Sequence, residues 1–463
     1  MLVLAVAVLG AARPSDAAQP PDWRSDWAVA DGFSLQRDSL GYDFPTAIAF
    51  VPHPGPAPDD PLYFVAELRG AIKVVTNDRT VHTFVEDFFA LQPTAELPSG
   101  SGEVGLAGIC LAPEQGYVFA TFAYQDAAGI LRNNIVRFES APGTFGLAPI
   151  AQTDFSQTFA ADESSTSHQI GSCQVAEDGL LYVGVGDGHQ IDRSQEIDST
   201  LGKVLRMTLD GDPVDDNPFR RDEDRKTPQN YVWAMGFRNP FGLQVLTGRV
   251  FVADNGLNID RLVAAEAGGN YLWNGSDWST GSNAAFTMAP SVGVVQMATM
   301  GEATAGFPSS YRDSFFVALS GNLPWTANAD AQRPPGVIAI PYDFTEDRLA
   351  AVPDYVLRYV GDGVQMVAGV AGAGRAVRGS HLSRRRRRKR GVPAGLGARP
   401  GTPKAPGQRT GCRVFDGQAW LPRLPQSGRQ RRQRRAAAGS HCIGSARPGT
   451  TKIRKLLANP GRL

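Results

Sequence analysis

The sequence predicts an all-β protein of the β-propeller class, and two observations carry this prediction. Apolar segments of about four to six residues recur along residues 1–370, each alternating or continuously apolar, and no long helical period competes with them. Gly (51 residues) and Pro (33 residues) are frequent and well spread, as is typical of short strands joined by turns. Sheets that recur every ~40–60 residues are too small to bury their own faces, which favours radial stacking in a propeller. A β-sandwich with irregular strands is the alternative.

The repeated unit is an apolar strand, a turn rich in Pro, Asp or Gly, a second apolar strand and a third strand. Five copies are visible before residue 371, and we expect each to form one sheet of the propeller. The copies occupy residues 47–75 (strands at 48–52, 62–67 and 70–75), 106–138 (108–111, 117–122 and 134–138), 172–209 (181–187 and 202–207), 242–264 (249–254) and 313–342 (315–319 and 336–340).

Residues 1–18 are expected to form a secretory signal peptide. An apolar run over 1–9 is followed by small residues at 15–18 that suit cleavage. The first basic residue is Arg13, so the usual positive segment is missing and we expect a signal that is truncated at its start. A buried N-terminal strand is the alternative. No other segment reaches the ~18 apolar residues of a membrane span, so we expect a periplasmic or secreted protein without one.

The C-terminal part of the chain differs sharply in charge from the rest. Of the 46 basic and 46 acidic residues, 24 Lys and Arg but only one acidic residue lie in 371–463, which leaves 22 basic and 45 acidic residues for 1–370. We therefore assign 30–370 to the propeller and 371–463 to an Arg-rich, low-complexity tail that is expected to be disordered. A frameshift in a GC-rich gene is the preferred interpretation. The alternative is an arm that binds nucleic acid or anionic surfaces, for which an exported protein has little use, so no nucleic-acid partner is expected.

Two of the four cysteines lie outside this tail. Cys110 and Cys173 each open a similar phrase, an apolar strand entry followed by a Gly turn and a second strand. If these phrases are equivalent strands of neighbouring repeats, the two sulfur atoms lie close together. An exported chain permits a disulfide, and two buried thiols that pack as small hydrophobic groups are an equal alternative.

Two stretches about 70 residues apart carry the candidate functional groups. Ser-His-Gln-Ile-Gly at 167–171 leads into a strand, and a histidine at that position can act as a base near neutral pH. Gly-Phe-Arg-Asn-Pro-Phe-Gly at 236–242 is followed by Ala-Asp-Asn-Gly at 253–256 and by Gly-Gly-Asn-Tyr-Leu-Trp at 268–273. Its guanidinium and neighbouring amide suit a planar ligand that carries several negative charges.

Together these motifs resemble the active site of the soluble glucose/sorbosone dehydrogenases that depend on pyrroloquinoline quinone (PQQ). These are six-bladed quinoprotein β-propellers. The resemblance implies oxidation of a sugar or of an aldehyde or alcohol carbinol by hydride transfer to PQQ, which carries the difficult chemistry. It assigns His168 as the general base and Arg238 and Asn239 as cofactor-binding residues. It also implies that the backbone carbonyls of Gly256 and Leu257 bind a Ca²⁺ ion that polarises the quinone.

The resemblance covers about residues 40–370, so it implies a sixth blade that is corrupted or missing in this chain. Ser167 stands where the family often has an Asp that helps to orient the histidine. Arg261 stands where an acid is common, and residues 320–323 hold no basic residue at a position where the family often has one.

The resulting prediction is an exported PQQ-dependent sugar dehydrogenase whose partners are a small sugar or aldehyde substrate and an external electron acceptor. Two alternatives stay open. A propeller can bind a glycan or a protein without catalysis, because a fold does not fix a function. A Ca²⁺-dependent propeller lactonase is the other, but it needs several carboxylates around an axial ion, and only Asp254 and Asp260 lie near the right phrase.

Overall fold

The computed structural model describes residues 23–91, 104–221, 226–299, 308–311, 313–321 and 334–361, together with Val367 and Gly369. The predicted signal peptide (1–18) and the predicted basic tail (371–463) therefore lie outside the described residues. The chain divides into two compact units, Met1–Arg385 and Arg386–Leu463, and every described residue belongs to the first.

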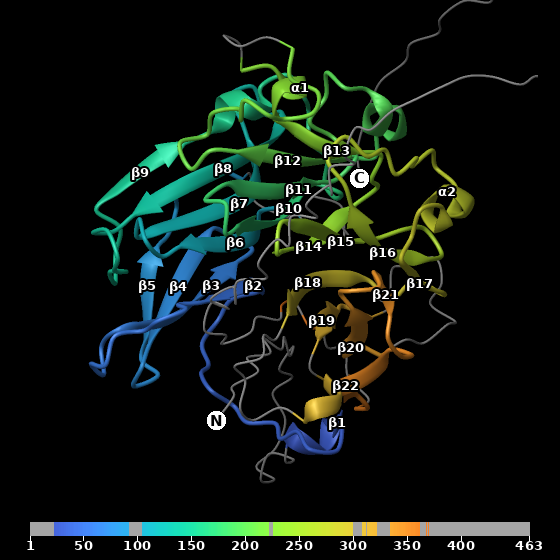
Figure 1. Cartoon of the computed structure of the whole chain (residues 1–463). Helices are drawn as coiled ribbons and strands as arrows, with labels where there is room; N and C mark the ends of the chain where they lie inside the picture. The colour runs from blue at the N-terminus through green and yellow to red at the C-terminus, as the bar shows by residue number, and fades with distance from the viewer. Residues whose placement is uncertain are drawn as a thin grey trace, which may run out of the picture. The chain divides into compact units, whose positions relative to one another are not determined.

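The described part of the first unit contains five antiparallel sheets, which follow one another along the chain (Figure 1). In four of them the strands pair in sequence order from the innermost to the outermost. The four are β2 (Pro45–Phe50), β3 (Pro61–Glu67), β4 (Ala71–Thr76) and β5 (Val81–Val85); β6 (Leu106–Ala112), β7 (Tyr117–Gln125), β8 (Leu131–Glu139) and β9 (Ala151–Asp154); β10 (Ile170–Val175), β11 (Leu181–Val185), β12 (Lys203–Met207) and β13 (Val232–Met235); and β14 (Pro240–Leu246), β15 (Arg249–Asp254), β16 (Asp260–Ala265) and β17 (Phe286–Met288).

The fifth sheet combines both ends of the described chain. It runs in the order β18 (Val294–Thr299), β19 (Ser314–Leu319), β20 (Gly336–Asp343), β22 (Asp354–Tyr359) and β1 (Trp27–Val29), with β21 (Arg348–Leu349) paired to β20. The described helices are all short: η1 (Trp23–Asp26), η2 (Ser156–Phe159), η3 (Ile191–Gln195), η4 (Ser309–Tyr311), α1 (Pro228–Tyr231) and α2 (Asp277–Gly281). None of the helices in the described ranges is long and apolar enough to cross a membrane.

The sheets pack face to face around their inner strands. β2, β6, β10, β14 and β18 contact one another in chain order, and an apolar cluster fills each space between successive sheets. On β7, Val118 packs into the cluster shared with the first sheet, whereas Phe119 packs into the cluster shared with the third. Successive side chains of a strand point to opposite faces, so one sheet is buried between two others. This radial arrangement confirms the predicted β-propeller and excludes the two-layer sandwich.

The predicted repeats match the inner strands better than the outer ones. The first four copies fall on β2–β4, β6–β8, β10–β12 and β14–β16, but the sequence did not reveal β5, β9, β13 and β17. β9 illustrates the reason, because none of its four side chains is buried and no apolar pattern marks it. The fifth copy was placed too late, since its sheet begins with β18 rather than at residue 313. Five sheets are described, and the sixth blade that the sequence resemblance implies falls outside the described residues.

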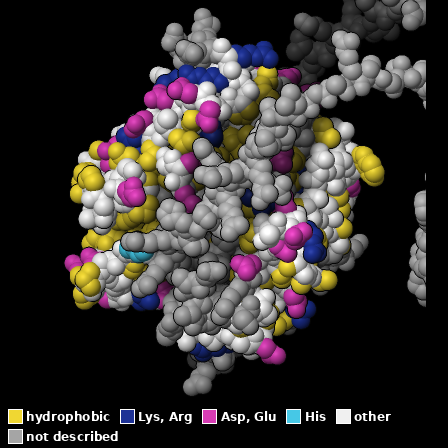
Figure 2. Space-filling model, in the orientation of Figure 1, with side chains coloured by type: hydrophobic (Ala, Val, Ile, Leu, Met, Phe, Trp, Pro, Cys, Tyr) yellow, Lys and Arg dark blue, Asp and Glu magenta, His cyan; other side chains and the backbone are white. Residues whose placement is uncertain are grey.

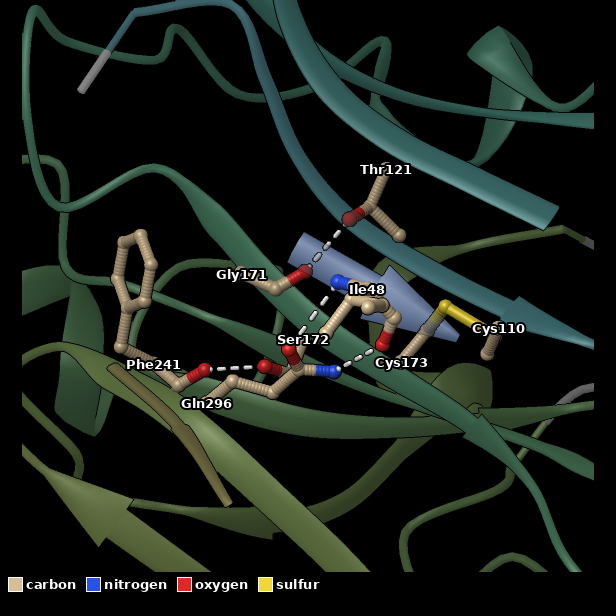
Figure 3. The surroundings of a disulfide bond; sticks show 8 residues. All are labelled: Ile48, Cys110, Thr121, Gly171, Ser172, Cys173, Phe241 and Gln296. Atoms are coloured by element: carbon tan, nitrogen blue, oxygen red, sulfur yellow. Dashed lines mark hydrogen bonds between the residues drawn. A yellow bond between two sulfur atoms is a disulfide. The ribbon is translucent and has the colours of Figure 1, made fainter. Parts of the chain in front are cut away.

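Polar side chains join the inner strands of neighbouring sheets. The Thr121 hydroxyl donates to the Gly171 carbonyl at 2.5 Å, and the Ser172 hydroxyl donates to the Phe241 carbonyl at 2.5 Å. These two contacts link consecutive sheets. A third contact joins the two ends of the series, where the Gln296 amide of β18 accepts from the Ile48 N–H of β2 at 3.2 Å and donates to the Ile48 carbonyl at 2.8 Å (Figure 3).

Cys110 and Cys173 form a disulfide that joins β6 to β10, and so the second sheet to the third (Figure 3). Of the two alternatives left open by the sequence, the covalent one is therefore present. The described surface is also rich in acidic side chains, which Figure 2 shows spread over several sheets rather than gathered in one patch. This distribution accords with the excess of acidic residues in 1–370.

Candidate active site

His168 lies two residues before β10, at the inner end of the third sheet, and is 6% exposed. Its Nδ1 lies 2.7 Å from the Asp187 carboxylate, which is 1% exposed and follows β11. The other Asp187 oxygen accepts a hydrogen bond from the Trp273 indole N–H at 2.7 Å. A carboxylate bound to Nδ1 places the proton on that nitrogen and the lone pair on Nε2. The structure thus supplies an oriented imidazole of the kind a general base requires.

Asp187 is ionised at neutral pH. Its burial raises the pKa, but the hydrogen bonds and charge of His168 and the hydrogen bonds from Trp273 and the His189 N–H outweigh burial, so the pKa lies below its ordinary value. Ser167 stands where the family often has an Asp that helps to orient the histidine. In the structure the carboxylate at Nδ1 comes instead from Asp187, after the neighbouring strand, and the Ser167 hydroxyl contacts His189 Nε2 at 2.5 Å.

A glycine makes this arrangement possible. Gly186 donates its N–H to the Gln169 carbonyl at 2.9 Å, which continues the β10–β11 pairing to the position of His168. A Cβ at Gly186 would lie 2.3 Å from the His168 carbonyl oxygen, closer than any side chain can approach. His168 itself has a φ of 55°, in the left-handed region that most residues avoid. Backbone strain at a buried histidine is a common property of functional sites.

The imidazole ring of His189 packs against the ring of His168. The two imidazole rings lie 3.9 Å apart between centroids and are inclined by 31°. Burial lowers the pKa of His189, and the charges of His168 and Arg238 lower it further. His189 is therefore neutral at pH 7 and packs against His168 without competing for its carboxylate.

Arg238 and Asn239 occupy the loop between β13 and β14, next to this histidine pair. The Asp254 carboxylate accepts the N–H of Arg238 at 3.2 Å and the N–H of Asn239 at 2.7 Å. The Arg238 carbonyl accepts the N–H of Asp187 at 2.7 Å, and its guanidinium lies 5.8 Å from the centre of the Trp273 ring. Trp273 thus contacts Arg238 directly and is linked to His168 through Asp187, so the structure places the His168–Asp187 pair close to the Arg238–Asn239 loop.

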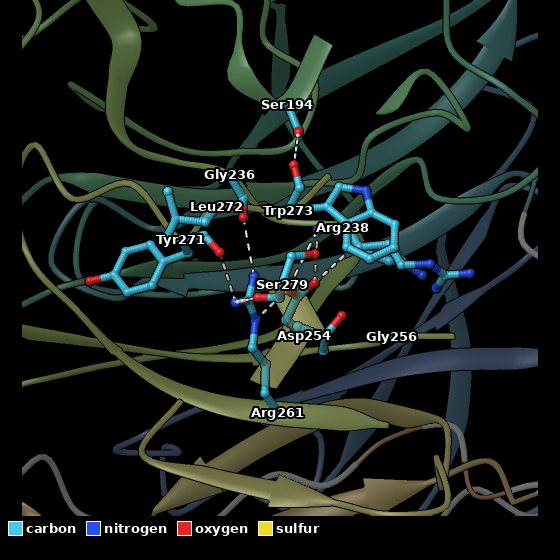
Figure 4. A network of polar contacts seen from close by, with 12 residues as sticks. Ser194, Gly236, Arg238, Asp254, Gly256, Arg261, Tyr271, Leu272, Trp273 and Ser279 are labelled. Carbon is cyan, nitrogen blue, oxygen red and sulfur yellow. Dashed lines mark hydrogen bonds and ion pairs between the residues drawn. The ribbon is translucent and has the colours of Figure 1, made fainter. Parts of the chain in front are cut away.

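A fully buried ion pair holds these loops in place (Figure 4). Arg261 lies 2.8 Å from Asp254, and the two side chains are 0% and 1% exposed. The Arg261 guanidinium also donates to the carbonyls of Gly236, Tyr271, Ser279 and Ser282. The residue that departs from the family pattern therefore ties the Arg-Asn loop to the Trp273 loop.

The predicted calcium ligands lie at the far end of the same loop cluster. A Cβ at Gly256 would lie 1.8 Å from the Ile259 carbonyl oxygen, so the turn requires glycine. The Gly256 N–H donates to the Asp260 carboxylate at 3.0 Å, and the Leu257 carbonyl accepts from the Ser291 hydroxyl at 3.4 Å. Asp260 directs both oxygens to backbone N–H groups, of Gly256, Val292 and Gly293. The carbonyl oxygens of Gly256 and Leu257 are a donor type that Ca²⁺ accepts.

The profile of the glucose/sorbosone dehydrogenase family matches residues 43–320, more than half of the chain. The chain belongs to this family. Curated relatives include aldose sugar dehydrogenase YliI of Escherichia coli K12, 28% identical over 131 residues that make up 27% of this chain and 34% of that protein. Quinoprotein glucose dehydrogenase B of Acinetobacter calcoaceticus is 28% identical over 131 residues, 24% of this chain and 26% of the relative. The chain thus aligns with about a third or less of these two relatives.

Solved structures agree on the propeller fold. The PQQ-bound aldose sugar dehydrogenase of Streptomyces coelicolor aligns with 75% of this chain and 89% of its own length, with a TM-score of 0.52 and 23% identity. The apo form of the soluble aldose sugar dehydrogenase of E. coli aligns with 71% of this chain and 88% of its own length, with a TM-score of 0.51 and 16% identity.

Sequence reasoning missed three residues of the family member's site. Asp187 and Trp273 end the segments 181–187 and 268–273, but no role was predicted for them, and His189 lies outside every predicted motif. A signal for Asp187 was present, because an acid that ends the strand paired with the histidine strand can reach that histidine. Of residues 320–323, which hold no basic residue, only Ser320 and Gly321 are described.

Proposed function

We propose that this family member oxidises an aldose, or a related aldehyde or alcohol carbinol, with His168 as the general base and PQQ as the hydride acceptor. The single observation that carries the proposal is the convergence of the His168–Asp187 pair and the Arg238–Asn239 loop on Trp273. A base, a fixed cation and an aromatic wall are what a site for a planar anionic cofactor and a hydroxylated substrate needs.

The residues present fit the quinone. The Arg238 guanidinium can bind a carboxylate or carbonyl oxygen, and its backbone is held by Asp254. The Oδ1 atom of Asn239 is buried and makes no hydrogen bond within the described structure, so it can accept one from a donor group of a ligand. PQQ, when bound, supplies the electrophile that accepts hydride from the substrate carbon. Arg238 and Asn239 would orient it, and Trp273 would bound the site on one side.

His168 would take the proton of the substrate hydroxyl on Nε2. The imidazolium that forms would be stabilised by the ionised Asp187, whose second oxygen stays fixed by Trp273. Removal of the hydroxyl proton makes the carbon a better hydride donor, and a positioned base typically contributes 10²–10⁴-fold to such a step. An external electron acceptor would then be needed for a further turnover.

Ca²⁺ remains part of the proposal, with the carbonyls of Gly256 and Leu257 as its protein ligands. The rigid turn at Gly256 and the preference of Ca²⁺ for oxygen support it. Asp254 and Asp260 are engaged by Arg261 and by backbone N–H groups, so no observation favours the alternative lactonase. Export to the periplasm or beyond is also proposed, because the Cys110–Cys173 disulfide suits an oxidising compartment.

Ligand-dependent stabilisation tests the proposal. PQQ added with Ca²⁺ should raise the unfolding temperature, because a ligand that binds only the folded state stabilises it. Arg238→Ala should weaken this stabilisation by about 1.5–3 kcal/mol, the range for a hydrogen bond to a charged group. Oxidation of D-glucose with an artificial electron acceptor is the companion assay. Absence of a shift at saturating PQQ, or a shift that Arg238→Ala leaves unchanged, would count against the assignment.

A further inference from the structure

Gln169, the residue after the proposed base, has an amide whose nitrogen and oxygen are both buried without a hydrogen-bond partner in the described structure. The whole residue is 0% exposed. Leaving a buried polar group without a partner is costly, so native proteins rarely do it without a reason. The same strand shows the usual solution: Gln174 donates to the Val245 carbonyl at 2.9 Å and accepts from the Val245 N–H at 2.6 Å.

The backbone places Gln169 on the side of β10 that faces β14. Gln169 is still paired with the end of β11 through its carbonyl, so the side-chain alternation of a strand applies to it. Ile170 packs into the cluster between the second and third sheets, which leaves its neighbours on the opposite face. Gly171, two residues after Gln169, lies on this face and is close to β14, because a Cβ at Gly171 would lie 3.2 Å from the Phe241 Cα.

The contacts of β10 with β14 place Gln169 toward the loop that holds Asn239. A Cβ at Gly171 would lie 3.3 Å from the Pro240 carbonyl oxygen, and Gln169 lies two residues further back on the same face. Asn239, directly before Pro240, also carries a buried oxygen without a hydrogen bond. Two amide side chains, one of them next to His168 in the chain, thus carry buried polar atoms without partners in the described structure.

The hydrogen-bonding capacity of these amide atoms limits which chemical group of a ligand they can bind. Whichever way its amide is turned, Gln169 presents one acceptor and one donor, and the Asn239 oxygen adds a second acceptor. A carboxylate or a quinone oxygen only accepts hydrogen bonds, so it would leave the amide oxygens without a partner. A hydroxyl group both donates and accepts, and so it matches Gln169 completely.

We propose that Gln169 binds a substrate hydroxyl next to the carbon that reacts at His168, and so selects sugars with vicinal hydroxyls over substrates that lack the second one. This rests on the proposed function, because it takes His168 as the site of reaction. A site built to hydrogen-bond a hydroxyl discriminates strongly against the analogue without it, since its own polar group is then left unpaired.

The test compares Gln169→Met with the matched control Gln174→Met in the full chain, and uses Gln169→Leu as a second variant. Both replacements at 169 keep the size of the side chain and remove the amide. The first measurement is the unfolding temperature without ligand. The second is the shift caused by PQQ with Ca²⁺. The third is the ratio of kcat/KM for D-glucose to that for 2-deoxy-D-glucose.

We expect ligand-free Gln169→Met to unfold at the wild-type temperature or above it, because an amide without a partner is removed. Gln174→Met should unfold several degrees lower, since it loses backbone partners. The wild type and Gln174→Met should prefer D-glucose by about tenfold or more, and both variants at 169 should lose that preference while keeping the PQQ shift.

Three outcomes would overturn the proposal. If both variants at 169 unfold as early as Gln174→Met does, the amide has partners in the free protein. If the sugar preference survives in them, Gln169 does not read that hydroxyl, although the proposed function stands. If the wild type shows neither a PQQ shift nor sugar oxidation, the proposed function fails, and the role of Gln169 fails with it.

Discussion

His168 can act as a base only while Nε2 carries the lone pair, and Asp187 is the residue that decides this. The carboxylate holds Nδ1 at 2.7 Å and is itself fixed by the Trp273 indole. A histidine without such a partner would rotate and exchange tautomers. To act as a base, a histidine at this position therefore needs the buried carboxylate beside it as well as its own imidazole.

We predict that His168→Gln keeps PQQ binding but lowers kcat with aldoses by roughly 10²–10⁴-fold. Glutamine can keep a hydrogen bond to the substrate hydroxyl but cannot accept its proton, so the loss falls mainly on kcat. Rates of dye reduction by both proteins measure the effect. Equal rates in the two proteins would make His168 a structural residue and favour the binding propeller.

Lys203 is a buried lysine whose ammonium group binds backbone carbonyls close to the candidate site. Its ammonium group donates to the carbonyls of Arg193 at 2.8 Å, Ser194 at 3.1 Å and Leu201 at 2.6 Å. The Ser194 hydroxyl in turn donates to the Trp273 carbonyl at 3.1 Å. Burial lowers the pKa of Lys203 to about 7, and neighbouring acids only partly oppose this.

This pKa predicts a pH dependence of stability. Between about pH 7 and pH 10 the unfolded lysine holds a proton that the folded lysine has lost, so this group makes the free energy of unfolding rise with pH. The rise from pH 7 to pH 9 should amount to about 1–3 kcal/mol. Lys203→Met should lose it. Urea unfolding of both proteins at the two pH values gives the comparison, and parallel curves would show that Lys203 titrates normally.

At the scale of strands and sheets, the inner strands carry both the propeller and the site. His168 precedes β10, Asn239 precedes β14, and the disulfide joins β6 to β10. The polar links between inner strands, such as that of Thr121 to Gly171, set where these entrances lie relative to each other. The geometry of the candidate site is thus a consequence of how consecutive sheets are fixed together.

The disulfide provides the prediction at this scale. Cys110 and Cys173 are separated by 63 residues, and a cross-link of that length restricts the unfolded chain. Replacing both by Ala should lower the free energy of unfolding by about 2–4 kcal/mol. The measurement is urea unfolding in a background where Cys412 and Cys442 are Ser, so that reductant acts on one bond only. A reductant that leaves the midpoint unchanged would contradict the prediction.

Most of the strands that the sequence revealed are buried, although burial alone is not sufficient, because all four side chains of β13 are buried and this strand was not predicted. β7 shows an apolar run because both of its faces pack against neighbouring sheets, whereas β9 is polar and exposed and leaves no periodic signal. His168, Arg238 and Asn239 were found because they stand in short local motifs. Asp187 and Gln169 were not, because their importance depends on strand register and on missing partners, which no local pattern records.

At the scale of the whole molecule, the end of the described chain returns to the inner strands. Val367 is buried in the apolar cluster of the fifth sheet. A Cβ at Gly369 would lie 2.6 Å from the Gln296 Oε1 and 3.4 Å from the Ile48 Cγ2 atom, so this residue lies between β18 and β2. That is the position from which an inner strand of a further blade would start. The change from an acidic to a basic composition follows directly, at residue 371.

We therefore predict that a one-base shift near codon 371 opens a reading frame that encodes a sixth blade. It should contain an apolar strand, a tight turn with Gly and a second strand, and it should lack the run of seven basic residues at 384–390. A slipped frame in a GC-rich gene replaces acidic and small residues by Arg, Pro and Gly, which are the residues that dominate 371–463. The check is the nucleotide sequence around codons 365–385, read in all three frames. If neither other frame stays open, or if neither yields strand-like alternation, the basic segment is genuine. It should then bind polyanions with an affinity that falls steeply as salt rises, because each phosphate contact releases counterions.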